Sequence, residues 1–482
     1  MSVPLQRFVP NRTPCGRTRR EFLWQAGGGF AALALVDLLT RDRAWGTGTA
    51  ARTVHLPPRA RRVVFLFMNG GPSQVDTFDP KPLLTRFHNQ TYSGPCKVGS
   101  NGRPIGRLTQ SPFAFAAHGQ SGLPISSLYP HLARHADDLC VIRSMHTDTA
   151  AHASGCIQMN TGSVLLGRPS LGSWLSYGLG TANENMPAYV VMTDPRGGPI
   201  GSASNWSAGF MPAAHQGTLF RGEGPPLLDL ATPAGTTDAT QRAGLDLLNT
   251  LNAGHLRRFP GDTELASRIA SYELAYRMQT AAAEAVDLNR ERAATRTLYG
   301  LDRPATQDFA RKCLITRRLL ERGVRFVQLY SGGGHIEDTW DGHNDCVTNH
   351  RTHAGETDQP IAALIADLKR TGLWEDTLLV WGGEFGRTPT SEGVGKPGRD
   401  HNWHGFTMWL AGGGVKGGQA IGATDELGFA AVEERCHVSD LHATLLHLMG
   451  LDHRKLTYFH QGLDQRLTGV EREARVVSQA LA

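Results

Sequence analysis

The stretch LLVWGGEFGRTPTSEGVGKPGRDHNWHGFTMWLAGG, residues 378–413, decides the fold of this chain. An apolar run at 378–381 opens it, and a second apolar run at 406–410 follows the polar middle. Two such runs around a glycine-rich segment are typical of two buried strands joined by a loop. In an open α/β sheet, ligands bind outside the carboxyl ends of the strands. We therefore expect the loop to form one wall of a metal or anion site, the alternative being a surface loop with solvated charges. Its candidate site residues are Glu384, Arg387, Asp400, His401 and His404.

Three further apolar runs share this design, because each leads into glycine and polar residues. They lie at 63–68, 139–144 and 324–330. Continuous apolar runs suit strands that are buried on both faces, as in a parallel sheet. Since strands of this kind alternate with helical segments along the chain, the sequence predicts an α/β fold with a mainly parallel central sheet.

Helices are expected between these strands. Apolar residues on one side predict a helix at 125–136, and a second is predicted at 360–373, beginning at a proline. Residues 240–300 are rich in Ala, Glu and Arg, with apolar positions near helical spacing. This segment is predicted to be a helical insertion into the α/β domain.

Polar side chains that follow parallel strands emerge at one edge of the sheet and can converge there. Asp341-Gly342-His343 is the sharpest local pair, because two ligands so close together on a loop can hold one ion; the alternative is a turn whose aspartate caps a helix. Mixed imidazole and carboxylate ligands suit zinc or manganese, whereas all-oxygen sets suit magnesium or calcium. The predicted divalent-metal ligands are Asp341, His343, Glu384, His401 and His404, from a pool that also holds Asp76, Asp79, Asp148, His152 and Asp400.

The segment HTDTAAH at 146–152 follows the second apolar run. Its small residues would let a helix N-terminus, with its free N–H groups, come close to an anion. The alternative is a capped core helix. Arg387 is a candidate for holding a substrate anion through two parallel hydrogen bonds, and the alternative for it is a surface salt bridge.

Composition excludes several classes of function. The formal net charge is +5, but no basic stripe is interleaved with aromatic residues, which argues against nucleic-acid binding. The seven cysteines include no C-x-x-C pair, which argues against a structural zinc knuckle, and their scattered spacing argues against a disulfide framework.

The N-terminus predicts export. Thr18-Arg19-Arg20-Glu21-Phe22-Leu23 precedes a mildly apolar stretch at 24–39, a pattern similar to a bacterial twin-arginine signal. The alternative is a basic N-terminus that leads into a core helix. We assign residues 1–50 to the signal region, 51–470 to the α/β domain and 471–482 to a C-terminal tail, and we expect a periplasmic or secreted protein. No cleavage site is clear, so an uncleaved leader is the only membrane contact expected.

Long motifs identify a family resemblance that spans the chain after the leader. The sequence closely resembles the bacterial domain of unknown function 1501 family. The motifs that carry it are FMNGGPSQVDTFDPKP from Phe67, SRIASYELAYRMQ from Ser267, TWDGH from Thr339, WGGEFGRTP from Trp381, DHNWHGFTMWLAGGGVKGG from Asp400 and DLHATLLHLMGLDHRKLTYFHQGLDQRLTGV from Asp440. This family has no defined activity, so the resemblance implies a fold more than a reaction.

A more distant resemblance is to the alkaline phosphatase and sulfatase superfamily. DLHATLLHLMGL from Asp440 resembles the sulfatase D-x-x-P-T-L-L-x-L-x-G segment, and YPHLARHADDLCVIRS from Tyr129 resembles the helix and strand before the nucleophile. TDTAA from Thr147 resembles the phosphatase T-D-S-A-A, which makes Thr149 the nucleophile, whereas an ungapped count back from Thr161-Gly162 places His152 there. The resemblance implies a three-layer sandwich with a mainly parallel sheet.

The chain also departs from that superfamily. The sulfatase C-x-P-x-R sequence is absent, the metal aspartate of the first strand appears as Asn69, and the late Asp-His pair appears as Glu384-Phe385. A complete two-zinc set is therefore absent. The leading hypothesis is an exported metal-dependent hydrolase of phosphate or sulfate esters, acting on an anionic ester such as a sulfated or phosphorylated glycan, with Thr149, His152 and Arg387 as catalytic candidates. The alternative is a non-catalytic exported binding protein that retains the fold.

Overall fold

The computed structural model describes residues 54–94, 100, 105–221, 227, 232, 234–259, 263–392 and 398–482. Residues Ala50–Ala482 form one compact unit. The predicted twin-arginine signal at 1–50 lies outside the described residues. Among the described helices, none has both the length and the apolar character needed to span a bilayer.

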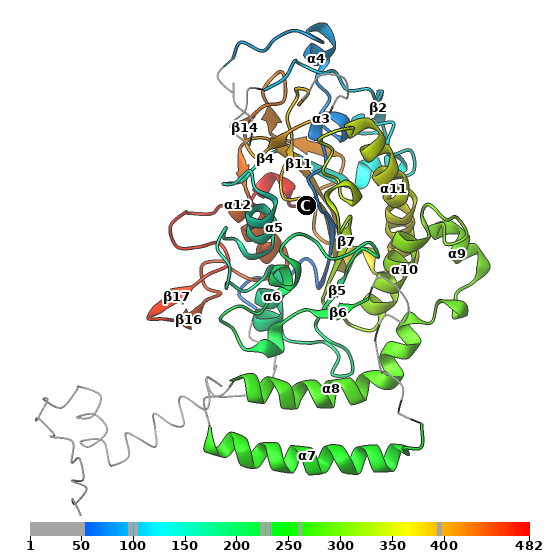
Figure 1. The fold of residues 1–482 in the computed structure, drawn as a ribbon, viewed down its shortest axis with the longest axis vertical. Coiled ribbons are helices and arrows are strands. Elements are labelled where there is room, and N and C mark those ends of the chain that lie inside the picture. Colours follow the sequence, from blue (N-terminus) through cyan, green and yellow to red (C-terminus); the bar gives the residue numbers. More distant parts are fainter. Residues whose placement is uncertain are drawn as a thin grey trace, which may run out of the picture. The chain divides into compact units, whose positions relative to one another are not determined.

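A mixed, mostly parallel sheet forms the centre of the unit (Figure 1). The strand order is β12-β4-β11-β8-β1-β7-β5-β6, and β15 also pairs with β4. Only β11 runs antiparallel to its neighbours in this sheet, β4 and β8. The predicted α/β class with a mainly parallel sheet is confirmed. The strand bounds are β1 Arg62–Met68, β4 Leu139–His146, β5 Tyr189–Met192, β6 Thr218–Phe220, β7 Phe326–Ser331, β8 Thr377–Gly382, β11 Phe406–Gly412, β12 Gln419–Ile421 and β15 Cys436–His437.

The apolar run of β1 explains its central place. β1 pairs in parallel with β7 on one side and with β8 on the other. Successive side chains of a strand point to opposite faces. Val64 and Leu66 therefore join one hydrophobic core, while Phe65 and Phe67 join another on the opposite face. A strand flanked in this way needs apolar residues at nearly every position, which is what the sequence provides.

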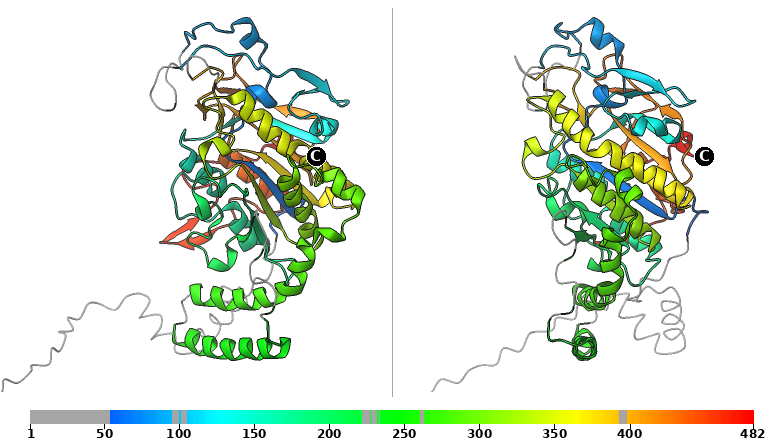
Figure 2. Two further views of the ribbon diagram at one scale, coloured as in Figure 1. Left: turned by 45° about the vertical axis from the view of Figure 1, so that its right-hand side comes forward. Right: turned by 90° about the vertical axis from the view of Figure 1, so that its right-hand side faces the viewer.

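Helices cover both faces of the sheet, which gives three layers (Figures 1 and 2). On the face of Val64, α10 (Gln307–Glu321) and α11 (Cys346–Arg370) contribute buried residues to the first core. On the other face, the second core is completed by α5 (His152–Thr161), α6 (Leu171–Leu179) and α12 (Val438–Leu448). The predicted three-layer sandwich is confirmed.

The segment predicted as a helical insertion contains α7 (Asp238–Arg258), α8 (Thr263–Val286) and α9 (Ala293–Tyr299). Residues 471–482, assigned to a tail from the sequence, pack on the domain. Ala480 is fully buried, and its carbonyl accepts the Lys416 N–H at 2.9 Å.

Two predicted helices differ from the structure. The helix predicted at 360–373 is part of α11, which begins at Cys346, where the Asp345 side chain accepts the Thr348 N–H. Pro360 lies inside that helix rather than at its start. The helix predicted at 125–136 is instead a strand, β3 (Leu123–Ser126), which pairs with β2, followed by the 3-10 helix η1 (Leu132–Asp138), because Pro130 lies inside the predicted helix and interrupts helical hydrogen bonding.

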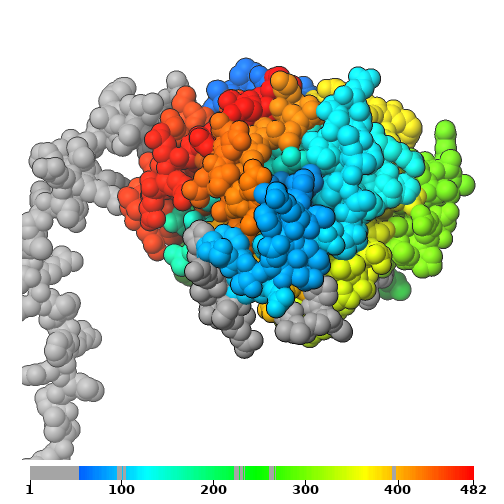
Figure 3. Space-filling view, turned by 90° about the horizontal axis from the view of Figure 1, so that it is seen from above, coloured from blue at the N-terminus to red at the C-terminus, as the bar shows by residue number. Residues whose placement is uncertain are grey.

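Short elements cover the carboxyl edge of the sheet, where residues 75–94 and 105–130 lie beside residues 400–440 (Figure 3). Val75, Leu84, Leu108 and Phe429 form a separate apolar cluster there. The elements of this region are α3 (Gln74–Thr77), α4 (Pro82–Arg86), β2 (Phe115–His118), β3, β9 (Gly386–Arg387), β10 (His401–Asn402), β13 (Ala423–Thr424) and β14 (Ala431–Glu433), and a separate hairpin is formed by β16 (Tyr458–His460) and β17 (Leu463–Gln465).

Asp194 ties the segment after β5 to the end of β7. Its carboxylate accepts the Gly332 N–H at 2.8 Å and pairs with Arg196 at 2.7 Å. Burial acts to raise its pKa, but Arg196, Lys312 and the Gly332 N–H outweigh burial and lower the pKa to about 2. The contribution of Asp194 to stability is therefore present above its ordinary pKa of 3.8 and is lost as the pH falls toward 2.

We expect Asp194→Asn to lower the free energy of unfolding at pH 7 by about 2 kcal/mol, since each unit of pKa shift corresponds to about 1.4 kcal/mol. The loss should shrink as the pH falls from 4 toward 2. Urea unfolding at several pH values measures it, with the exposed Asp464→Asn as control. Equal losses at pH 7 and pH 3 would contradict the linkage.

Candidate metal centre

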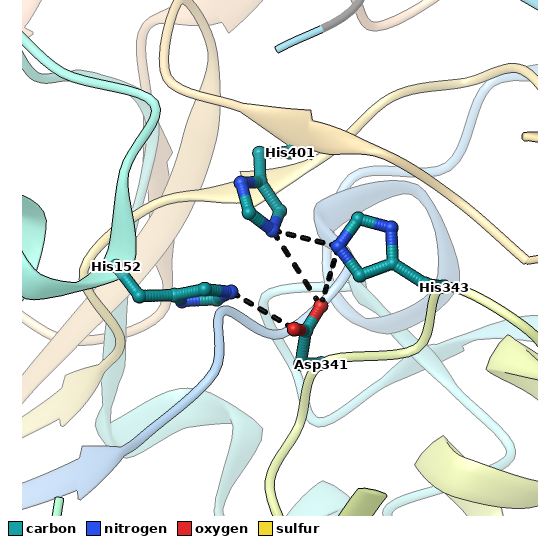
Figure 4. Close-up of side chains that lie close together, drawn as sticks. All are labelled: His152, Asp341, His343 and His401. Atoms are coloured by element: carbon teal, nitrogen blue, oxygen red, sulfur yellow. Dashed lines mark hydrogen bonds and ion pairs between the residues drawn. The ribbon is translucent and has the colours of Figure 1, made fainter. Parts of the chain in front are cut away.

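Four side chains from distant parts of the sequence meet at the carboxyl edge of the sheet (Figure 4). His152 begins α5 after β4, Asp341 and His343 follow β7, and His401 lies in β10. One nitrogen or oxygen from each lies within 4.8 Å of all the others. The convergence follows from the topology, because β4, β7 and β8 are mutually parallel and their loops leave the sheet at the same edge.

Asp341 is the centre of the group. Its Oδ1 atom lies 3.0 Å from His343 Nε2 and 3.6 Å from His401 Nε2, while its Oδ2 atom lies 3.0 Å from His152 Nε2. The Nε2 atoms of His343 and His401 are 2.9 Å apart. Asp341 is almost fully buried, whereas the side chain of His343 is 25% exposed, so the centre is reached from the His343 side.

Each of the three imidazoles uses its other ring nitrogen to contact an acceptor. His401 Nδ1 donates to the Ala150 carbonyl at 2.6 Å, and His152 Nδ1 donates to Glu384 Oε1 at 2.6 Å. His343 Nδ1 contacts the Glu392 carboxylate. Outer acceptors of this kind are the usual partners of metal-bound histidines, because they fix the tautomer and the ring orientation.

These contacts place the proton of each neutral imidazole on Nδ1, so the three Nε2 lone pairs face the middle of the group. The Nε2 atoms of His343 and His401 then form no hydrogen bond with each other unless a cation or an added proton lies between them. His152 Nε2 and Asp341 Oδ1 are buried without a hydrogen bond of good geometry. Buried polar atoms without partners are rare, and a missing ion is one reason for them.

The spacing of these atoms also fits an ion. Ligand atoms about 2.0–2.2 Å from a tetrahedral zinc lie about 3.3–3.6 Å from one another. The observed separations of 2.9, 3.0 and 3.6 Å among His343 Nε2, His401 Nε2 and Asp341 Oδ1 lie near this range. The group therefore fits a small divalent cation, and its donors are rich in nitrogen.

The electrostatics of the centre are dominated by Asp341. Burial acts to raise the pKa of this carboxyl, but Arg387 and the three histidines hold the pKa well below its usual range. Burial lowers the pKa of His401 to about 4. For His152 and His343, burial acts to lower the pKa, yet their carboxylate partners raise it above the usual value. The site is therefore charge-dense, with an ionised carboxylate at its core.

Arg387 is buried completely and faces inward. Its Nη1 atom lies 2.6 Å from Asp341 Oδ1, and its other nitrogens donate to the carbonyls of Gly70 and Gly71. Arg387 lies opposite His401 in the β9–β10 pair, so the backbone brings the two together. With its donors engaged, this guanidinium holds Asp341 and the turn after β1 instead of reaching toward solvent.

Glu384 lies behind the centre. It is fully buried, it contacts His152, and it accepts the Gly70 N–H at 2.9 Å. Its role here is to orient His152. Asn69, at the end of β1, donates to the Gly332 carbonyl at 3.3 Å.

Besides Arg387 and Glu384, two more candidate residues lie outside the group of four. His404 is exposed and its ring contacts Trp403 at 4.4 Å between centroids. Thr149 is partly exposed, and its hydroxyl oxygen accepts the Ala151 N–H at 3.2 Å. Of the other pooled acids, Asp76 pairs with Arg399, Asp79 with Lys81 and Asp148 with His437. Asp400 accepts the Ser100 N–H, and it also forms a second group with His343 and Glu392 that could hold an ion.

Glu392 is a residue of the site that the sequence did not indicate. It lies in no helix or strand, so no periodicity points to it, and its partner His343 follows a different strand.

We expect Glu392→Gln to weaken metal binding about 10–100-fold, because outer partners of ligating histidines have effects of that size. The amide would still fill the space but would hold the His343 ring less firmly. Titration calorimetry with zinc measures the change, and Glu426→Gln, a change of the same kind in the β13–β14 connection, is the control. Unchanged affinity in the Glu392 variant would show that its contact with His343 has no role in binding.

Comparisons with known proteins were made with the sequence and with the structure. A family model described as "Protein of unknown function (DUF1501)" matches residues 60–481. No curated protein matches. Among solved structures, a lipoteichoic acid synthase of Listeria monocytogenes shares 11% identity at a TM-score of 0.34, covering 88% of this chain and 79% of its own.

Two further solved structures are similar to the same extent. A sulfatase of Pseudoalteromonas shares 14% identity at a TM-score of 0.35, covering 86% of this chain and 73% of its own. The alkaline phosphatase of the Antarctic bacterium TAB5 shares 11% identity at a TM-score of 0.31, covering 75% of this chain and 93% of its own.

Proposed function

Since the chain belongs to the DUF1501 family, whose model matches residues 60–481, we propose that it is an exported metal-dependent hydrolase of phosphate or sulfate esters. The observation that carries this proposal is the convergence of three Nε2 atoms on Asp341, each imidazole being held from behind by an acceptor at Nδ1. Export is supported by the twin-arginine sequence at Arg19-Arg20, and the ester class is supported by the resemblance of the segment from Asp440 to sulfatases.

The donor set favours zinc or manganese. Imidazole nitrogen suits these ions, whereas magnesium and calcium prefer sites made of oxygen. When bound, such an ion would polarise an ester oxygen and lower the pKa of a bound water. His343, His401 and Asp341 would hold it, with His152 facing the second oxygen of Asp341.

The remaining residues of the site position these ligands. Glu384 and the Ala150 carbonyl fix the ring orientations of His152 and His401. Arg387 holds the Asp341 carboxylate in place. Because Glu384 holds Nδ1 of His152 and its Nε2 atom faces Asp341, we assign His152 a ligand or positioning role, which leaves Thr149 or a water as the nucleophile.

A decisive test measures metal content and ester hydrolysis on the same preparation. The full chain is stripped with a chelator and reloaded with zinc, manganese, magnesium or calcium, then assayed on the para-nitrophenyl esters of phosphate and sulfate. We expect hydrolysis that depends on zinc or manganese, that His401→Ala abolishes and that His404→Ala retains. If the protein binds metal but hydrolyses no phosphate, phosphodiester, phosphonate or sulfate ester, the proposed hydrolase activity is refuted.

A second candidate is a non-catalytic binding protein, and one observation favours it. Each guanidinium nitrogen of the buried Arg387 already contacts Asp341 or the carbonyl of Gly70 or Gly71, so this arginine is held inside the protein instead of facing a substrate anion. This candidate predicts that an anionic glycan binds to the metal-loaded protein without turnover.

A further inference from the structure

The helix α7 has a face without a partner in the described structure. None of its residues is buried, and it packs on α8, which itself packs on α10. Figures 1 and 2 show α7 on the side of α8 away from the sheet. An isolated helix in water is marginal, so a helix of this length usually buries an apolar face.

The face turned away from α8 carries a regular stripe. Residues that bond to α8, such as Arg242 and Asn249, both reaching Glu273, mark the inner face. At 100° per residue, a second set of positions lies on average about 170° around the helix from that face. We call this set the outer stripe; it consists of Thr240, Gly244, Leu247, Leu251, Gly254 and Arg258.

The apolar members of the outer stripe are exposed. Leu247 is 61% exposed and Leu251, one turn later, is 62% exposed. Two large leucines at this spacing on one face of a helix form the seam of a helix–helix contact. Nothing within the described chain covers them.

The two glycines of the outer stripe are not required by any contact within the part of the chain that the structure describes. A side chain at Gly244 would meet open space, and one at Gly254 would meet only the end of the Arg257 side chain at 3.7 Å. Each glycine inside a helix costs about 1 kcal/mol relative to alanine. Small residues at such positions are favoured where another helix approaches closely.

The stripe is symmetric about its centre. When two copies of α7 cross antiparallel at the level of Asn249 along the helix axis, Leu247 faces Leu251 of the partner subunit and Gly244 faces Gly254 of the partner subunit. Two-fold interfaces require such self-complementary surfaces.

The charges also favour the antiparallel arrangement. The last turn of α7 carries His255, Arg257 and Arg258, whereas the first turn carries Asp238. An antiparallel crossing brings the basic end of each helix near the acidic end of the other and opposes the two helix dipoles.

We propose that the outer stripe of α7 is a homodimer interface, in which the α7–α8 hairpins of two copies form an antiparallel four-helix bundle. The occupant of the stripe is a second copy of this chain, chosen because the stripe complements itself in shape and in charge. A contact built on one helix from each copy lies at the small end of protein interfaces, so the dimer should dissociate at micromolar concentrations.

Sedimentation velocity of the full chain over a concentration series tests the proposal. We expect a reversible dimer, and we expect Leu247→Glu with Leu251→Glu to raise its Kd at least about 10-fold, because the glutamates lie face to face in the dimer. The matched control is Leu165→Glu with Leu166→Glu. These two leucines are 66% and 70% exposed in the connection between α5 and α6, and their replacement should leave the dimer intact.

A third variant separates this interface from non-specific apolar association. Gly254→Leu adds apolar surface and favours the helix, so it would strengthen a non-specific contact, but it should weaken a dimer that needs close approach at that position. A monomeric wild-type chain, a dimer insensitive to the glutamates, or a dimer strengthened by Gly254→Leu would overturn the proposal. So would a dimer lost on removal of residues 1–49, which would identify that segment as the occupant.

Discussion

Replacing His343 with alanine is expected to remove bound metal from the purified protein. His343 supplies one of three Nε2 atoms at the centre, and its Nε2 lies 3.0 Å from Asp341 and 2.9 Å from His401. Loss of a direct ligand should exceed the 10–100-fold effect of an outer partner, so we expect affinity for zinc to fall by more than about 100-fold. Elemental analysis should then give far less than one ion per chain.

The same loss should appear in stability. A ligand present at 100 times its Kd stabilises the folded state by about 2.7 kcal/mol, and the variant should lose this increment. Because the His343 side chain is partly exposed, the metal-free variant should unfold close to the metal-free wild type. His404→Ala is the matched control, since it removes an exposed histidine from the same loop as His401. Equal metal content in the wild type, His343→Ala and His404→Ala would show that the group of His152, Asp341, His343 and His401 does not bind an ion.

Replacing Arg387 with methionine is expected to lower the free energy of unfolding by about 3–5 kcal/mol. That is the usual consequence of removing one partner of a buried ion pair, because the other charge stays buried without compensation. Here the carbonyls of Gly70 and Gly71 would also lose their donor. Methionine retains much of the volume, so the loss should come mainly from the polar contacts.

Arg454→Met provides the comparison. Arg454 lies 2.7 Å from Glu473, nearly the same distance as Arg387 from Asp341, but both partners are mostly exposed. Exposed pairs contribute about 0–1 kcal/mol, so this variant should unfold near the wild type. Urea unfolding of the metal-free proteins measures both. If Arg387→Met lowers the free energy of unfolding only slightly, the Arg387 guanidinium contributes little to the stability of the site.

The sheet and the edge that carries the site follow from the sequence for a simple reason. The runs that became β1, β4, β7 and β8 are apolar at nearly every position, which only a strand buried on both faces requires. Parallel strands place their following loops at one edge, so the meeting of Asp341 and His343 with His401 could be anticipated without knowing strand order.

The finer features could not be anticipated. His401 and His404 are the same residue type, three positions apart, so the sequence does not distinguish them. The pairing of β10 with β9 places His401 opposite Arg387, whereas His404 lies against Trp403. The burial of Arg387 depends on carbonyls far away in the chain, and the contact of Glu392 with His343 joins two irregular segments. In each case the deciding partner is distant in sequence and leaves no local periodicity.

The antiparallel strand β11 has a consequence for how such proteins can diversify. β8 ends at the carboxyl edge of the sheet, and β11, which is antiparallel to it, begins there. The connection between them therefore starts and ends at the same edge, and β9 and β10 pair near its two ends. The cost of closing a loop grows slowly with its length. The Glu392 N–H donates to the Gly398 carbonyl at 3.0 Å, so the chain between these two residues can lengthen or shorten while Glu392, His401 and Arg387 keep their places. Natural variation or protein engineering can therefore change the access to the candidate metal centre without changing the side chains that form it.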